Sequence, residues 1–342
     1  DWSSDVCSSD LIACDRLRGE NDLVLRPLPV ELRALRAVDD ALFINGNHAG
    51  LVDLAGLECL EQVEMLTLDN NDGLVDIGAL AGLDSCPALW LGGNGMLSDA
   101  SALSGVTDMN AMVVSFAGPL TVLPTLPAGT HLNKLWLNEV PELSDLTPLA
   151  GLHGSSVTID SLPALTSIAP LAGWWIPDDP EASLGLARLK NLDSLAGLEG
   201  LRTLNGLSLY ELPGLTSLAP LADLRSVDFM SLQGLRSLST LAGLTSLKEV
   251  GRLDIGYCVS AGVDELVDLN GLAAMTSLGV LSVLGNANLQ SLGGLDGLVS
   301  GPQVLVAADN PKLSQAAMTD FIAAHAVPDT TTCTAPGDCC GF

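Results

Sequence analysis

The sequence predicts a solenoid of stacked short coils, with a curved parallel β-sheet on the concave side, 3₁₀ or irregular turns on the convex side, and little α-helix. Two observations lead to this fold class. The first is a run in which a large aliphatic residue stands at every third position from Leu189 to Leu207 and then, after a step of two, at Leu209. An α-helix requires alternating steps of three and four, and a strand requires a step of two. The run therefore suits short 3₁₀-like turns that lead into a strand.

The second observation is that this pattern recurs along the chain. Twelve Leu-x-Leu pairs or aliphatic equivalents can be aligned, at Leu42/Ile44, Leu66/Leu68, Leu89/Leu91, Met112/Val114, Leu135/Leu137, Val157/Ile159, Leu184/Leu186, Leu207/Leu209, Val227/Phe229, Leu253/Ile255, Leu281/Val283 and Leu305/Ala307. Five positions after the first member of most pairs comes Asn or an aliphatic residue, as at Asn71, Asn94 and Leu212. We expect the Asn amides of successive coils to form a ladder that satisfies backbone groups at the turns. No coil can bury its apolar side alone, so the stability of the solenoid is the sum of the contacts between neighbouring coils.

The repeat pattern divides the chain into segments. The coils occupy residues 41–313, and residues 12–40 are interpreted as an N-terminal cap remnant or a degenerate repeat, because Leu32, Leu35 and Val38 keep the step of three. Residues 314–327 are predicted to form a capping helix that begins after Ser314 as N-cap. Residues 328–342 form a Cys-rich tail. Two longer coils interrupt the pattern, and in the first of them Trp174 takes a leucine position, which predicts that it lies in the core.

These repeats resemble a known family. The Leu-x-Leu-x-x-Asn core resembles the leucine-rich repeat, and the stretch from Leu143 to Leu152 resembles the short repeats of internalin-type bacterial surface proteins. The spacing after Asn, as from Asn71 to Leu74, and the closing segment Asn310-Pro-Lys-Leu313 are similar to receptor L-domain repeats of bacterial secreted proteins. The resemblance covers about residues 39–325, and it implies a recognition module that is secreted or displayed on the cell surface.

The first eleven residues are treated separately. Residues 1–11 resemble the translation of a common sequencing-adapter oligonucleotide, so they are set aside from the fold as an artefact, with a genuine Ser- and Asp-rich tail as the alternative. We therefore expect that the true start of the protein, including a signal sequence, is missing from this fragment.

The charge of the chain limits the classes of partner that it is expected to bind. The net charge is −27, and the 14 basic residues form no cluster. Nucleic acid and anionic membrane surfaces both require a basic patch, so neither is an expected partner. No apolar stretch in this fragment is long enough to span a membrane. The segment Asp69-Asn-Asn-Asp-Gly73 has an oxygen-rich composition that could bind calcium, but it lies at the turn of a repeat and lacks the full spacing of a calcium loop, so the turn is the favoured interpretation.

The cysteines favour an oxidising location. Cys333, Cys339 and Cys340 lie in the polar tail with no His nearby, which reads better as a set of disulfide partners than as a zinc site. A cytosolic thiol tail is the alternative. Cys59 and Cys86 stand one coil apart, so they either face each other or are buried free thiols.

The candidate site is a surface. The sequence contains no metal-binding His spacing, nucleophile motif or phosphate-binding loop, so we expect no catalytic residue, no metal and no cofactor. In a curved solenoid the residue between the two leucines faces outward from the sheet on the concave side. Trp90 and Trp136 occupy this position two coils apart, about 10 Å from each other. The predicted ligand-binding residues are Phe43, Thr67, Trp90, Val113, Lys134, Trp136, Asn138 and Tyr210.

Two function classes remain open. The first is a non-enzymatic extracellular or cell-surface recognition module that binds a protein, peptide or glycan on the concave face. The second is a structural or surface-layer spacer without a specific ligand. Exposed Trp favours the first class because Trp dominates binding hot spots, whereas packing of the two rings against each other, or under a missing N-terminal segment, would favour the second. The ligand, the anchoring and the oligomeric state do not follow from the sequence.

Overall fold

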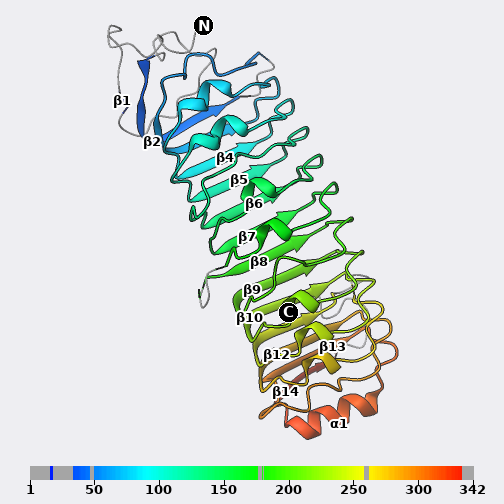
Figure 1. Cartoon of the computed structure of the whole chain (residues 1–342). Coiled ribbons are helices and arrows are strands. Elements are labelled where there is room, and N and C mark those ends of the chain that lie inside the picture. The colour runs from blue at the N-terminus through cyan, green and yellow to red at the C-terminus, as the bar shows by residue number, and fades with distance from the viewer. Residues whose placement is uncertain are drawn as a thin grey trace. The chain divides into compact units, whose positions relative to one another are not determined.

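The computed structural model describes residues 16–17, 34–46, 50–175, 179, 181–257 and 262–332. The chain forms two compact units, which divide between Ala164 and Leu165. Each unit is a solenoid in which every coil contributes one strand to a parallel sheet, and the connecting segments carry 3₁₀ turns (Figure 1). This architecture confirms the predicted fold class.

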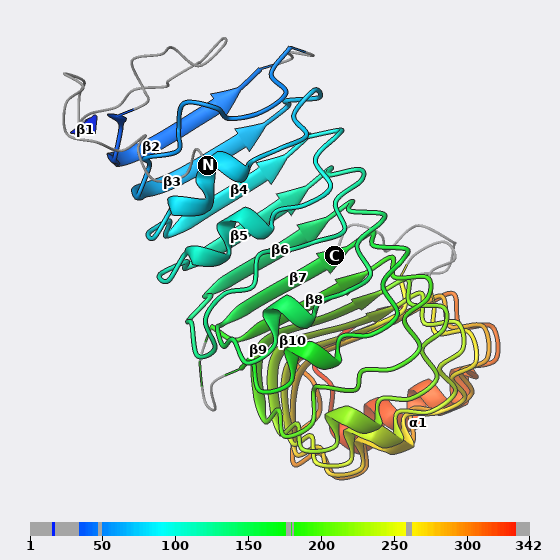
Figure 2. The same cartoon turned by 45° about the horizontal axis from the view of Figure 1, so that its top comes forward.

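Unit 1 contains a parallel sheet in which each strand pairs with the next strand along the chain. Its strands are β1 (Arg16–Leu17), β2 (Ala37–Asn45), β3 (Gln62–Asp69), β4 (Ala88–Gly92), β5 (Ala111–Ser115), β6 (Lys134–Asn138) and β7 (Ser156–Asp160). The 3₁₀ helices η2 (Gly78–Gly82), η3 (Ser101–Gly105) and η4 (Thr147–Leu149) lie in the return segments of the coils. Figure 2 shows these return segments on the side of the coil opposite the strands.

Unit 2 repeats this arrangement. Its parallel strands are β8 (Ser183–Ala187), β9 (Thr203–Tyr210), β10 (Ser226–Gln233), β11 (Glu249–Ile255), β12 (Ser277–Leu284), β13 (Val304–Ala308) and β14 (Asp329–Thr332), again paired in chain order. Its 3₁₀ helices are η5 (Ala169–Leu171), η6 (Ala219–Leu221), η7 (Ala242–Leu244) and η8 (Asn270–Leu272).

The predicted leucine positions form the core of both units. In the run that begins at Leu189, every leucine as far as Leu209 is buried, and so are the equivalent leucines of the other coils. Trp174, which takes a leucine position, is fully buried as predicted.

One alignment from the sequence is wrong. In β10 the pair that matches Leu207 and Leu209 is Met230 and Leu232, not Val227 and Phe229. Phe229 instead pairs with Gly206 and is exposed, and Ser231 takes the outward position that the sequence alignment gave to Asp228. Because the apolar period in this tract is three residues, a shift of one period still places aliphatic residues on aliphatic residues. The hydrophobic pattern alone therefore does not fix the register.

Short polar side chains start the 3₁₀ turns. Asp145 Oδ1 accepts a hydrogen bond of 2.8 Å from the backbone N–H of Thr147, and Ser217 Oγ accepts one of 3.1 Å from Ala219. Such side chains mimic a turn and hold the backbone at the entry of a helix. Pro148 and Pro220 follow in the first turn, where a missing N–H costs nothing. This explains the related segments Ser144-Asp-Leu-Thr-Pro148, Thr166-Ser-Ile-Ala-Pro170 and Thr216-Ser-Leu-Ala-Pro220.

Asparagine ladders close the turns after the strands in part of each unit. Asn94 Oδ1 accepts hydrogen bonds of 3.3 Å from both the backbone N–H and the side-chain amide of Asn71, and Asn94 Nδ2 donates to the carbonyl of Leu68 at 2.9 Å. In unit 2 Asn310 binds Asn286 in the same way. Each Asn thus satisfies backbone groups of the preceding coil, which confirms the predicted ladder. Asn71 is a buried member of it, and this agrees with the turn interpretation of its segment.

One α-helix is found in the described part of the chain. Helix α1 (Gln315–His325) follows β13, and the Oγ of its N-cap Ser314 accepts a hydrogen bond of 3.1 Å from the backbone N–H of Ala317. Its Met318 and Phe321 are buried. The Phe321 and His325 rings pack against each other with centroids 4.6 Å apart.

Several sequence predictions lie outside the described residues. They concern the adapter-like segment 1–11, most of the cap segment 12–40, and the Cys-rich tail from Cys333 onward with Cys339 and Cys340. Among the described cysteines, neither alternative holds for Cys59, and the free-thiol alternative holds for Cys86. Cys59 is disulfide-bonded, whereas Cys86 is a buried free thiol, so these two residues do not bond to each other. Burial raises the pKa of the Cys86 thiol to about 12.

Candidate ligand-binding face

The strands of unit 1 place the predicted site residues on the face opposite the leucine core, which we term the outer face. Because side chains alternate along a strand, the residue between the two core positions points outward. The strand register aligns these residues into one row across β2–β7, here called the middle row: Phe43, Thr67, Trp90, Val113, Trp136 and Thr158. The middle row therefore contains five of the eight predicted residues.

The two tryptophans are the prominent side chains of the middle row. Trp90 is 43% exposed and Trp136 is 38% exposed, while Val113, which pairs with both, is 8% exposed. Trp90 and Trp136 thus stand two strands apart, about 10 Å, with a small buried residue between them. Both rings keep substantial accessible area, so the pair is neither buried in a core nor covered in the described structure.

Lys134 flanks the second tryptophan. It begins β6, and its Nζ lies 5.3 Å from the centroid of the Trp136 ring, which is within the range of a cation–π contact. Such a contact orients the Trp136 ring while the aliphatic stem of Lys134 covers apolar surface. The predicted residues Lys134 and Trp136 therefore form one local structure.

A second row runs parallel to the middle row at the ends of the strands, here called the end row: Asn45, Asp69, Gly92, Ser115, Asn138 and Asp160. Asn138 is the predicted site residue in this row. Burial raises the pKa of the Asp69 carboxyl, and a hydrogen bond from the backbone of Asn70 partly offsets that effect. The Oδ1 atom of Asn45 is buried without a hydrogen-bond partner. The end row thus places acid, amide and hydroxyl groups beside the exposed aromatic rings.

Tyr210, the last predicted residue, belongs to unit 2. It ends β9, where it pairs with Ala187 and Gln233, and it is half-buried. Burial, with the neighbouring Glu211 as a further cause, raises the pKa of its hydroxyl. The seven other predicted residues form one set on unit 1, whereas Tyr210 lies on unit 2.

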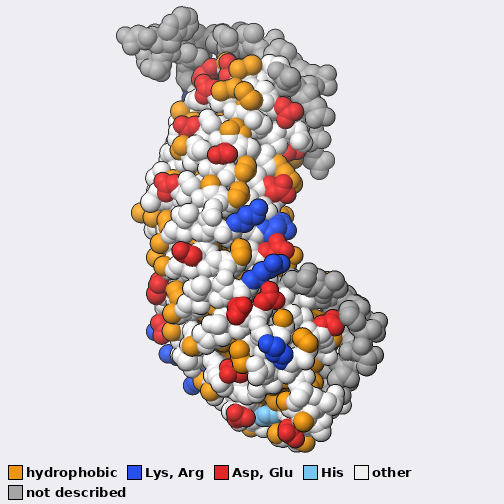
Figure 3. All heavy atoms as spheres, turned by 90° about the vertical axis from the view of Figure 1, so that its right-hand side faces the viewer, with side chains coloured by type: hydrophobic (Ala, Val, Ile, Leu, Met, Phe, Trp, Pro, Cys, Tyr) orange, Lys and Arg blue, Asp and Glu red, His pale blue; other side chains and the backbone are white. Residues whose placement is uncertain are grey.

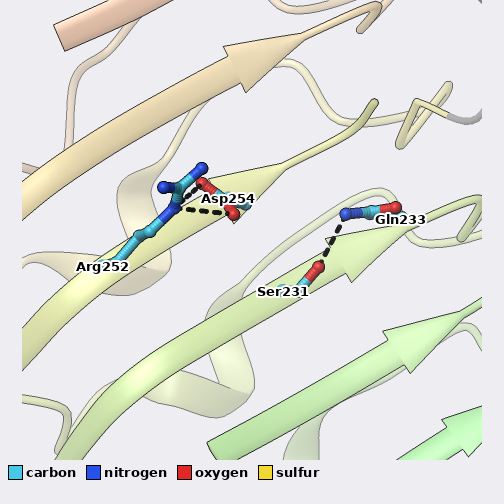
Figure 4. Close-up of polar contacts among 4 residues, drawn as sticks. All are labelled: Ser231, Gln233, Arg252 and Asp254. Carbon is cyan, nitrogen blue, oxygen red and sulfur yellow. Dashed lines mark hydrogen bonds and ion pairs between the residues drawn. The ribbon is translucent and has the colours of Figure 1, made fainter. Parts of the chain in front are cut away.

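The outer face of unit 2 carries a polar cluster (Figure 4). Arg252 Nε donates to both carboxylate oxygens of Asp254 at 3.0 Å, and Gln233 Nε2 donates to Ser231 Oγ at 2.8 Å. Burial raises the pKa of Asp254 despite the opposing effect of Arg252. Sequence analysis missed Ser231 and Gln233 because of the shifted alignment of β10.

The charge pattern is mixed. On the described part of the face in Figure 3, basic and acidic side chains are interspersed among apolar and uncharged ones. No group of three or more His, Cys, Asp or Glu residues within the described ranges is arranged to hold a metal ion. The one α-helix described in this structure, α1, is too short to cross a membrane.

Comparisons with known proteins identify a similar fold. No protein-family model matches the chain, and no curated protein matches it in sequence. Among solved structures, an internalin (inlF) from Listeria monocytogenes str. 4b F2365 matches with a TM-score of 0.51 and 18% sequence identity, over 89% of this chain and 84% of that protein. The fold of this chain is therefore similar to that of an internalin, a leucine-rich-repeat solenoid.

Proposed function

We propose that this chain is a non-enzymatic recognition module that acts outside the cytoplasm and binds a protein, peptide or glycan on the outer face of unit 1. The observation that carries the proposal is the pair of half-exposed tryptophans, Trp90 and Trp136, aligned on alternate strands. Tryptophan concentrates contact energy at binding surfaces, and exposed Trp is uncommon elsewhere. Phe43, Thr67, Val113, Lys134 and Asn138 surround the two rings and complete the proposed face.

Two further observations support the proposal. The disulfide-bonded Cys59 fits an oxidising compartment, because disulfides persist mainly outside the cytosol. The structural similarity to an internalin supports a leucine-rich-repeat scaffold, which presents side chains along an extended sheet. The tail cysteines Cys333, Cys339 and Cys340 remain predicted disulfide partners.

The test is a binding screen followed by substitution. Purified protein is applied to arrays of extracellular proteins and of glycans, and the affinity of any ligand found is measured by calorimetry. We expect the double variant Trp90→Ala/Trp136→Ala to lose at least about 2 kcal/mol of binding free energy, or roughly 30-fold in affinity. Phe229→Ala is the matched control, because Phe229 is an exposed aromatic residue on a strand of unit 2. Equal affinity of the double variant and the wild type would refute the proposed face.

A structural spacer is the second candidate. The middle positions of unit 2 favour it, because four of them carry the small residues Gly185, Ser208, Ser231 and Ser282, while Asp254 and Val306 occupy two others. Small side chains offer few anchors for a ligand. A spacer would bind no ligand in a manner that depends on Trp90 and Trp136, so the same double variant distinguishes the two functions.

A further inference from the structure

Three polar atoms of unit 1 converge on the backbone of residue 92, where only glycine lets them approach so closely. A Cβ atom placed on Gly92 would stand 2.5 Å from Asp69 Oδ1, 2.8 Å from Trp90 Nε1 and 3.3 Å from Ser115 Oγ. These atoms come from β3, β4 and β5, whose register brings Asp69, Gly92 and Ser115 side by side in the end row. We call this arrangement the Gly92 niche, with Gly92 as its floor and Asp69, Trp90 and Ser115 as its walls.

The walls of the niche retain unused hydrogen-bonding capacity. Within the described residues, neither the Trp90 indole N–H nor the Ser115 hydroxyl forms a side-chain hydrogen bond, although Ser115 is only 8% exposed. The Asp69 carboxylate accepts a hydrogen bond of 2.7 Å from Asn70 through Oδ2, and its other oxygen, Oδ1, is the atom nearest to the niche. Trp90 is exposed, and Ser115 Oγ is not one of the buried side-chain atoms that lack a partner, so a ligand can reach both groups from solvent. The niche is therefore suited to a ligand group that both donates and accepts.

The combination of wall atoms selects among ligand groups. Asp69 offers an acceptor, Trp90 a donor, and Ser115 either role. An ammonium group only donates, so it would leave the indole N–H unpaired. A carboxylate, sulfate or phosphate group only accepts, and it would be repelled by Asp69. An extended peptide directs the N–H and C=O of each unit to opposite sides, so a single unit does not serve both walls at one point. A hydroxyl group donates and accepts from one oxygen atom.

The surroundings of the niche extend this selection. The half-exposed rings of Trp90 and Trp136 are flat apolar platforms beside a row of polar groups, and the smaller, buried side chain of Val113 lies between them. A sugar ring presents an apolar C–H face and a rim of hydroxyl groups at the same time, which matches an aromatic platform next to hydrogen-bonding walls. The acidic balance of the chain, with a net charge of −27, disfavours an anionic polysaccharide.

We propose that the Gly92 niche is a subsite for a sugar hydroxyl and that the ligand of the outer face is a neutral glycan. The inference rests on the proposed function and names its ligand class. Trp90 then has two roles: its ring supports the sugar face and its indole N–H donates to the hydroxyl in the niche. Asp69 accepts the hydroxyl proton in a hydrogen bond, and no covalent step is involved.

The experiment uses three single variants of the full chain. Gly92→Ala places a methyl group against Asp69 Oδ1 and Trp90 Nε1, so both side chains must shift away from the niche while Trp136 is not touched. Trp90→Phe keeps an aromatic platform and removes the N–H donor. Gly206→Ala is the matched control, because Gly206 also lies on a strand and the nearest atom to an added Cβ is Ser183 Cβ at 3.8 Å. Circular dichroism and the thermal midpoint establish that each variant is folded. If Gly92→Ala does not fold, Trp90→Phe carries the test alone.

The probes are short neutral oligosaccharides of glucose, mannose, galactose, xylose and N-acetylglucosamine, together with sulfated and uronic-acid counterparts. We expect binding to a neutral probe, an affinity lower by about tenfold or more for Gly92→Ala, and a loss of about two- to tenfold for Trp90→Phe, which is the range of one hydrogen bond. Gly206→Ala should bind as the wild type does. Preference for the anionic probes, or equal binding by all variants, overturns the inference.

The outcomes also separate this inference from the proposed function. If a protein or peptide binds and its affinity falls in Trp90→Ala/Trp136→Ala but not in Gly92→Ala, the neutral-glycan subsite is wrong and the recognition face stands. If a neutral glycan binds but its affinity is unchanged in both the double tryptophan variant and Gly92→Ala, both proposals are wrong.

Discussion

The asparagine ladder of unit 1 allows a quantitative test of how neighbouring coils stabilise each other. In the Asn94→Ala variant, the backbone N–H of Asn71 and the carbonyl of Leu68 each lose their hydrogen bond to the Asn94 side chain. The Asn71 amide loses one contact but keeps its hydrogen bond of 2.8 Å to the carbonyl of Ile44. Asn94 itself is fully buried, so water does not replace the lost partners without local opening.

The magnitude follows from the two orphaned backbone groups. A buried donor or acceptor left without a partner costs about 1–3 kcal/mol, so Asn94→Ala should lower the free energy of unfolding by about 2–6 kcal/mol. The loss should concentrate in unit 1, because the affected groups belong to β3 and the turn that follows it. Asn205→Ala is the control, since Asn205 is an exposed asparagine on β9 and its replacement should change stability by less than about 0.5 kcal/mol.

The assay is urea denaturation followed by far-ultraviolet circular dichroism, with tryptophan fluorescence as a second probe. Trp90 lies four residues before Asn94, so fluorescence reports on the affected region. If Asn94→Ala unfolds within about 0.5 kcal/mol of the wild type with an unchanged dependence on urea, the ladder does not contribute as reasoned here.

Two further predictions concern close packing and charge. Gly154→Ala should destabilise unit 1 by about 1–3 kcal/mol or more, because the added Cβ would collide with the carbonyl of Leu132. Gly118→Ala is the control, because a Cβ at Gly118 meets open space. Equal thermal midpoints for the two variants would contradict this prediction. Asp254 has a folded-state pKa raised by burial, so the contribution of this residue to stability should rise as pH falls through that pKa. Asp254→Asn should match or exceed the wild type in stability at neutral pH and lose this advantage toward acidic pH. A variant less stable than the wild type at neutral pH would show that the ion pair with Arg252 stabilises the fold by more than the burial of the Asp254 carboxylate costs.

The leucine pattern predicted the core because each buried position is occupied by the same kind of side chain in coil after coil. It failed at β10, where Val227 and Met230 are both buried and the tract offers two apolar alignments three residues apart. A count of coil length resolves the choice, since Leu207, Met230 and Leu253 are aligned by the strand register at equal intervals. Equal coil length was thus the stronger signal in this region.

The candidate face was predictable in part. The alternation of side chains along strands identified Trp90 and Trp136 as outward residues, and the structure shows that both are half-exposed. The Gly92 niche could not be inferred from one strand, because its walls come from three coils and depend on their register. A signal was nevertheless present: the end row carries polar side chains on β2, β3, β5, β6 and β7, and only Gly92 on β4 interrupts that series.

The direction of the asparagine ladder has a consequence for biosynthesis. Asn94 serves the strand end of the coil made before it, and Asn310 serves that of the coil carrying Asn286. A chain that emerges from the ribosome amino-terminus first therefore exposes open donors and acceptors at its newest edge until the following coil arrives. At these places a coil is completed only when the asparagine of the next coil has been synthesised. A pause in translation just before Asn94 or Asn310 would therefore leave a hydrogen-bonding edge open to other chains.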